Sequence, residues 1–255
     1  MLLAHDDDMK RRVRVTAIQL LVSLSVALAA AALIFFVWYP SPLDQVAGGL
    51  KLFGVLVAVD VVLGPLLAAV VASPGKPTSE LRRDIAVIAT LQLAAFSYGM
   101  YTIAQARPVL LVLEADRLQV VSAADLDGVA LERAEPSFRR LSWTGPRLAA
   151  VRRSHDIAET MRSIDQAIEG VALSQQPERW VDYGSQKDFA LKQAHPVSEL
   201  LKANSDLESS VARFARESGV ASNELRYMPV SGRRGNATAV IAPPDARIVG
   251  YLPMP

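Results

Sequence analysis

The segment Leu52-Phe-Gly-Val-Leu-Val-Ala-Val-Asp-Val-Val-Leu-Gly-Pro-Leu-Leu-Ala-Ala-Val-Val-Ala72 decides how this chain is organised. It has one ionisable side chain, Asp60, in a stretch long enough to cross about 30 Å of hydrocarbon as a helix. Two further stretches, at 15–39 and 85–106, carry no charge. Buried helices of a soluble protein are the alternative, but these rarely run so long without charges. The sequence therefore predicts an all-α bundle of three transmembrane helices, at 15–39, 52–72 and 85–106.

Basic residues in the flanking segments predict the orientation, because Lys and Arg concentrate on the cytoplasmic side. The loop Pro40–Lys51 has one basic residue, at its end, and the aromatic residues Trp38 and Tyr39 precede it. The remaining bases precede the first span or separate the second and third: Lys10, Arg11, Arg12, Arg14, Lys76, Arg82 and Arg83. We expect residues 1–14 in the cytoplasm and residues 107–255 on the opposite side.

The first apolar stretch also resembles a secretory signal peptide, which has a basic start and small residues such as those at 27–32. Its apolar run continues through Leu33-Ile-Phe-Phe-Val37, past the length of an ordinary signal core. We interpret it as a retained span.

Composition argues against several classes of protein. The net charge is +1, and residues 107–255 carry 19 bases and 19 acids, so no electrostatic argument favours a nucleic-acid partner. Without cysteine, disulfides and thiolate zinc sites are excluded. The chain also lacks a phosphate-binding glycine loop, a metal-spaced His pair and a Gly-x-Ser-x-Gly elbow. We expect no enzyme, no catalytic residue, no metal and no cofactor.

Residues 107–255 have the size of one domain, and their pattern predicts a small α+β fold. Two short runs, Pro108–Leu113 and Leu118–Val121, predict a hairpin. Apolar residues at helical spacing predict an amphipathic helix from Asp156 onward: Ile157, Met161, Ile164, Ile168 and Val171. We expect further helices at 196–203 and 206–218, and strands at 225–230, 237–242 and 247–252.

Asp60 is the one acid inside a span, where a charge is costly unless it is paired, protonated or hydrated. Judged by depth, Tyr98 or Ser97 of the third span could hydrogen-bond it and lock the bundle. Gly64, one turn further on, would let a neighbouring helix approach closely. Pro65 removes a backbone donor and should kink the helix, which serves packing in the simplest interpretation.

Three roles are open for Asp60. The first is a hydrogen bond within the bundle, and the second is a contact to a partner's membrane helix. The third is a proton or ion relay, which would make the protein a small transporter or channel component. A relay would need a second acid, a His or a Lys inside the spans, and the sequence has none there. A membrane-tethered sensor is another alternative, although it would need a cytoplasmic output module.

A cluster of arginines stands out in the exported part, with no acid between Glu135 and Asp156 and with Trp143 among them. It could face an acidic partner or lipid headgroups. Solvated surface arginines are the simpler interpretation. The candidate basic surface consists of Arg139, Arg140, Arg147, Arg152 and Arg153.

Several ordered motifs within residues 14–125 resemble the type IV pilin accessory proteins of the TfpX/TfpZ kind. They are Phe36-Val-Trp-Tyr-Pro40, Val59-Asp-Val-Val-Leu-Gly-Pro-Leu-Leu67, Pro74-Gly-Lys76, Asp84-Ile-Ala-Val-Ile88, Ala104-Gln-Ala-Arg-Pro-Val109, Asp116-Arg117 and Val120-Val-Ser-Ala123. The resemblance implies a non-enzymatic protein of the bacterial inner membrane with a periplasmic C-terminal domain. It further implies that the protein assists the type IV pilin subunit, surface piliation and twitching motility. It carries no established functional residues.

Overall fold

The computed structural model describes residues 2–71 and 77–253. These form two compact units, one made of Met1–Val37 and Gly49–Gln105 and the other of Trp38–Gly48 and Ala106–Pro255. The segment Trp38–Gly48 thus belongs to the second unit, although residues 38–39 were expected to end the first span and residues 40–48 to form the loop after it. Ala72 and Lys76, which entered the span and charge predictions, lie outside the described residues.

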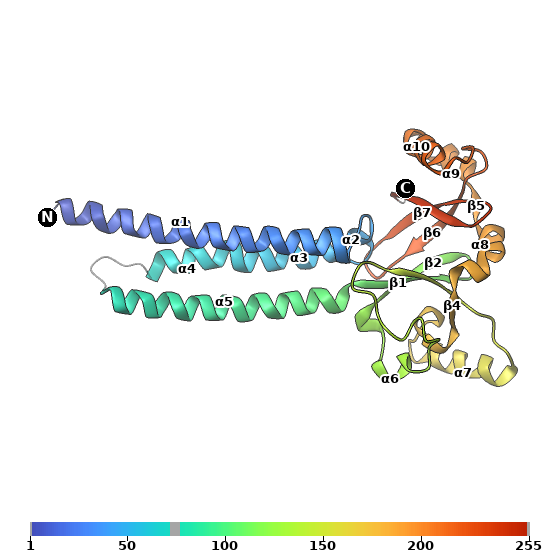
Figure 1. The fold of residues 1–255 in the computed structure, drawn as a ribbon, viewed down its shortest axis with the longest axis horizontal. Coiled ribbons are helices and arrows are strands. Elements are labelled where there is room, and N and C mark those ends of the chain that lie inside the picture. The colour runs from blue at the N-terminus through green and yellow to red at the C-terminus, as the bar shows by residue number, and fades with distance from the viewer. Residues whose placement is uncertain (1, 72–76, 254–255) are drawn as a thin grey trace. The chain divides into compact units, whose positions relative to one another are not determined.

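Apolar helices make up the first unit (Figure 1). Its elements are α1 (Leu2–Ala32), the π-helix η1 (Leu33–Trp38, whose last residue begins the second unit), α3 (Gly49–Val57), the π-helix η2 (Ala58–Leu63), α4 (Gly64–Val71) and α5 (Thr78–Ala106). The first helix packs along η2 and α4. Helix α5 meets the others where Gln92 hydrogen-bonds Gln19 of α1 and where the Leu56 side chain of α3 lies against Gly99.

Two helices of the described residues are long and apolar enough to cross a membrane, Ala17–Trp38 and Ser79–Ala106. Their apolar side chains point away from the protein, since only 22% of the first hydrophobic window and 6% of the second are buried. The second expected span is helical from Gly49 to Val71, but η2 interrupts it. The segment predicted as the second span is thus helical over its described residues, and its hydrogen-bond pattern changes around Asp60.

The second unit contains a mixed sheet in the order β4-β3-β1-β2-β6-β7-β8, with β5 paired to β6. The pairs β1–β3 and β2–β6 are parallel, and the others are antiparallel. The strands are β1 (Pro108–Glu114), β2 (Arg117–Ser122), β3 (Arg147–Val151), β4 (Trp180–Asp182), β5 (His195–Pro196), β6 (Arg226–Ser231), β7 (Asn236–Ala242) and β8 (Arg247–Pro253).

Helices flank this sheet, so a domain of helices and a sheet is confirmed (Figure 1). They are α2 (Leu43–Val46), η3 (Ala123–Asp125), α6 (Gly128–Leu131), α7 (Ile157–Ile168), η4 (Leu173–Gln175), η5 (Pro177–Arg179), η6 (Tyr183–Gln186), α8 (Lys187–Gln193), α9 (Val197–Ala203), η7 (Ser205–Leu207) and α10 (Glu208–Ser218). The hairpin β1–β2 and the strands β6 to β8 lie where the sequence predicted them. The strands β3 and β4 and the helix α8 were not predicted.

The segment Trp38–Gly48 is an integral part of the second unit. Leu43 and Val46 of α2 are buried, and the Val46 carbonyl accepts a hydrogen bond from the Arg234 backbone N–H at 3.1 Å. Gly232, in the turn between β6 and β7, lies so close to Val46 that a β-carbon would collide with it. This loop and the sheet domain must therefore lie on the same side of any membrane that the apolar helices cross.

Candidate functional site

The apolar stretch that contains Asp60 changes from α-helix to π-helix and back. Single π-turns within helices are often found at functional sites. In a π-helix, the carbonyl of Asp60 would accept a hydrogen bond from the backbone N–H five residues further on. That residue is Pro65, which has no N–H. The Asp60 carbonyl instead accepts a hydrogen bond from Gln92 Nε2 of α5 at 3.2 Å. A side chain from another helix thus supplies a donor that the proline cannot.

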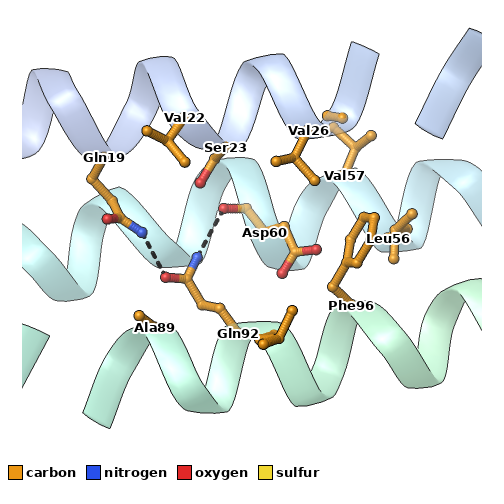
Figure 2. A pocket seen from close by; sticks show the side chains of 12 residues that line it. Gln19, Val22, Ser23, Val26, Leu56, Val57, Asp60, Ala89, Gln92 and Phe96 are labelled. Carbon is orange, nitrogen blue, oxygen red and sulfur yellow. Dashed lines mark hydrogen bonds between the residues drawn. The ribbon is translucent and has the colours of Figure 1, made fainter. Parts of the chain in front are cut away.

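Two amides bridge the helices at this point (Figure 2). Gln19 Nε2 on α1 donates to Gln92 Oε1 at 2.7 Å, and Gln92 Nε2 donates to the Asp60 carbonyl. In a membrane such interhelical hydrogen bonds contribute about 1 kcal/mol each. The bridge ties α1, η2 and α5 together at a single level.

Gly64 makes room for this bridge. A β-carbon at Gly64 would overlap the Gln92 amide, so the glycine admits the amide against the backbone of α4. The close approach expected at Gly64 is therefore made by a side chain rather than by a second helix backbone. The side chain of Pro65 is outside the described part of the structure, and the kink expected there stays a prediction.

The Asp60 carboxyl group is enclosed but has no partner. Its side chain is 8% exposed, and neither oxygen has a hydrogen-bond partner in the described structure. It borders a cavity of about 250 Å³ between the helices (Figure 2). The lining is mostly apolar: Gln19, Val22, Ser23, Val26, Ala27, Leu56, Val57, Asp60, Ala89, Gln92, Leu93 and Phe96.

The predicted hydrogen bond from Asp60 to Tyr98 or Ser97 was wrong. Tyr98 is 74% exposed, Ser97 is exposed as well, and the residues of α5 that line the cavity with Asp60 are Ala89, Gln92, Leu93 and Phe96. At about 100° per residue, Tyr98 lies some 240° around the helix from Gln92. Similar depth in a membrane brings two residues to one level but does not place them on facing sides.

The sequence interpretation missed Gln19 and Gln92. Gln19 is the one amide in residues 15–39, and Gln92 lies well inside residues 85–106, whose other amide, Gln105, is near the end. An amide at membrane depth needs a hydrogen-bond partner as much as an acid does. That signal could have found both residues. Chemically, the site offers two carboxyl oxygens in apolar surroundings to a donor or cation brought from outside. No metal-holding group of His, Asp and Glu occurs in residues 2–71 and 77–253.

The five arginines of the candidate basic surface do not act as one set. Arg152 forms a two-pronged ion pair with Glu159, at 2.7 and 3.0 Å. Arg147 lies over the Phe138 ring, with 4.9 Å from Cζ to the ring centroid. Arg139 donates to the Ala134 carbonyl at 3.0 Å. Arg140 and Arg153 are exposed. Only Arg139 and Arg140 lie in the loop that leads into β3, and Arg147 is the first residue of that strand.

Comparison with known proteins adds to this geometry. The family model described as "Fimbrial assembly protein FimB" matches residues 7–48. A fimbrial assembly protein of serogroup I from Dichelobacter nodosus is 36% identical over 229 residues, which is 89% of each chain. The chain belongs to the fimbrial assembly protein family. Another member from this organism, of serogroup E1, is 35% identical over the same share.

A shorter family member, of serogroups C1 and C2, is 43% identical over 113 residues, which is 44% of this chain and 86% of that protein. No solved structure matches the chain. The family name supports a role in pilus assembly and leaves open which residues perform it.

Proposed function

We propose that this fimbrial assembly protein is a non-enzymatic, multi-pass accessory factor of the bacterial inner membrane, of the TfpX/TfpZ kind. It assists type IV pilin stability or assembly, and with it twitching motility, by contacting the pilin subunit in the membrane and the periplasm. The membrane contact uses the Asp60 cavity. Support comes from the family, the exposed apolar helices and the unpartnered carboxyl group.

The exposure of apolar side chains on the helices supports the membrane placement. A core helix of a soluble protein buries most of its apolar side chains, whereas Leu91, Leu93 and Val70 are 65%, 66% and 71% exposed. Hydrocarbon is the solvent that accepts such surfaces.

The packing of Trp38–Gly48 into the sheet domain supports the topology. The distribution of basic residues favours an N-terminus inside, which would put the loop after the first span outside. Since that loop and residues 106–253 form one compact unit, this orientation would put the domain outside as well.

The observation that carries the proposal is the enclosed Asp60 carboxyl group without a partner. An unsatisfied buried polar group costs about 1–3 kcal/mol, and the described part of the bundle recovers none of this cost. An apolar partner helix that brings a donor or cation into the cavity would recover it. A residue kept at such a cost suits recognition better than stability.

Replacing Asp60 by Leu separates a role in pilin recognition from a role in protein stability. We expect Asp60→Leu to leave protein level and thermal stability unchanged or improved, because no internal hydrogen bond of the carboxyl group is lost. Pilin binding should weaken about 5- to 150-fold, the equivalent of losing 1–3 kcal/mol, and surface pili should decrease. Tyr98→Phe, on the exposed side of α5, is the matched control. Normal piliation and motility with Asp60→Leu would contradict the proposal.

Photo-crosslinking tests the contact directly. A crosslinker at Leu93, which lines the cavity, should capture pilin in cells. One at Leu91, which is equally exposed but absent from the lining, should capture far less. Equal capture at both positions would argue against a specific cavity contact.

A further inference from the structure

Two residues of the second unit mark the ends of the membrane-crossing helices. Trp38 is the last residue of the first candidate span, and Arg107 directly follows Ala106, the last residue of α5. Both are buried in the second unit, at 8% and 5% exposed. If the apolar helices cross a bilayer, as the proposed function requires, covalent connection holds both residues at its outer surface.

The loop between Phe138 and Arg147 is fastened to these two residues. The Trp143 ring centroid lies 6.1 Å from that of Trp38, and Arg107 Cζ lies 3.9 Å from the Trp143 ring centroid. Arg107 Nε also donates to the Ser142 carbonyl at 3.2 Å. A cation over an aromatic face and a backbone hydrogen bond therefore hold Trp143 beside the ends of both spans.

Trp143 differs from the other two tryptophans in exposure. It is 60% exposed, against 8% for Trp38 and 1% for Trp180. The headgroup region on each side of a bilayer is about 5–8 Å thick. Indole rings favour this layer because they are apolar with one polar N–H.

The positive charge of the loop between Phe138 and Arg147 also fits the headgroup region of a bilayer. Arg139 and Arg140 are exposed, and no acid occurs between Glu135 and Asp156. An acidic protein partner would need basic residues but no exposed tryptophan fixed to the span ends. Anionic phospholipid headgroups fit both features.

We propose that this loop, residues 138–147, is a lipid-contact site on the outer face of the membrane. Trp143 inserts among the headgroups, and Arg139 and Arg140 bind the phosphate groups of anionic phospholipids such as phosphatidylglycerol. The site would fix the sheet domain near the bilayer, close to a membrane-bound subunit. This inference rests on the proposed membrane placement.

Tryptophan fluorescence of the full-length protein in vesicles tests it. The Trp143 signal is the difference between the wild type and Trp143→Phe. In phosphatidylcholine vesicles that contain phosphatidylglycerol, bromine near the headgroup end of the acyl chain should quench this signal more than deep bromine. Brominated phosphatidylglycerol should quench more than brominated phosphatidylcholine at equal fraction.

A double variant, Arg139→Gln with Arg140→Gln, should reduce the preference for phosphatidylglycerol about fivefold or more, as expected for losing basic residues at an anionic surface. Arg153→Gln, exposed but outside the loop, should leave the preference unchanged. Equal quenching by both lipids overturns the anionic site. Quenching by aqueous acrylamide with no effect of brominated lipid overturns lipid contact, and protection of Trp143 by an added acidic protein domain alone overturns it in favour of that partner.

Alkaline washing of membranes separates the two proposals. A protein that stays in the membrane while Trp143 remains inaccessible to lipid overturns the loop proposal and leaves the Asp60 proposal intact. A protein that washes off overturns both, because both need the membrane placement.

Discussion

Two helices of the sheet domain, α7 and α10, show opposite uses of an amphipathic pattern. In α10, Val211, Phe214 and Ala215 are buried, and Phe214 lies directly over Gly250 of β8. In α7 the apolar residues are outside: Ile157, Met161, Ile164 and Ile168 are 81%, 59%, 49% and 79% exposed. The buried residue of α7 is Ser163.

The surroundings of each helix explain the difference. The sheet surface beneath α10 is apolar, with Val240 and Leu252 in the same core cluster. Beside α7 lies a polar network, in which Arg179 Nη1 donates to Ser163 Oγ at 2.5 Å and Ser163 Oγ donates to Gln176 Oε1 at 3.1 Å. Hydrophobic periodicity thus predicts that a helix forms, while the neighbouring elements decide which face is buried.

The largest expected effect is at the buried face of α10. Phe214→Ala removes an aromatic ring from the core and should lower the free energy of unfolding by about 3–5 kcal/mol. Denaturant unfolding of the full-length protein in detergent, followed by the fluorescence of buried Trp180, measures this change. A loss below about 1 kcal/mol would mean that α10 does not contribute to the core as its burial indicates.

An intermediate effect is expected at the ion pair that fastens α7. The Arg152 guanidinium, and next the His155 backbone N–H, hold the pKa of Glu159 at about 2, below its usual 4.5. The contribution of the ionised Glu159 carboxylate to folding stability is thus complete above about pH 4.5 and is lost as the pH falls toward 2. Glu159→Gln should cost about 1–3 kcal/mol at neutral pH and should flatten the acid limb of the stability curve.

The matched control for this ion pair is on α10. Arg213 and Glu217 are 4.0 Å apart and more than half exposed, so Glu217→Gln should change the unfolding free energy by at most about 1 kcal/mol. Unfolding curves between pH 2 and pH 7 distinguish the two pairs, since this range covers the titration of Glu159. An unchanged pH dependence in Glu159→Gln would contradict the role given to Glu159.

The smallest effect is expected on the exposed face of α7. Ile168→Ser should change the unfolding free energy by no more than about 0.5 kcal/mol, because the side chain is 79% exposed. The same denaturant experiment measures it, with Phe214→Ala as the reference. A loss of several kcal/mol would show that this face is covered in solution.

The elements that depend on local pattern could be predicted from the sequence. The strands at 226–231, 236–242 and 247–253 follow one another through short turns, and the hairpin β1–β2 is equally local. The strand β3 escaped prediction because it is short, bordered by arginines, and pairs in parallel with β1 across more than thirty residues. In the candidate site, the sequence singled out Asp60 and Gly64 but gave Asp60 the wrong neighbours.

The sequence by itself determined that the chain has long apolar helices, that a single acid lies within them, and that a domain of helices and a sheet follows. Composition and spacing suffice for these features because they depend on solvation and on contacts between near neighbours. Only the tertiary structure decided that Gln19 and Gln92 bridge the helices, that the Asp60 carboxyl group has no hydrogen-bond partner among the described residues, and that Trp143 lies beside Trp38 and Arg107. These contacts depend on which faces of distant segments meet, and each helix has several faces that satisfy the same local pattern.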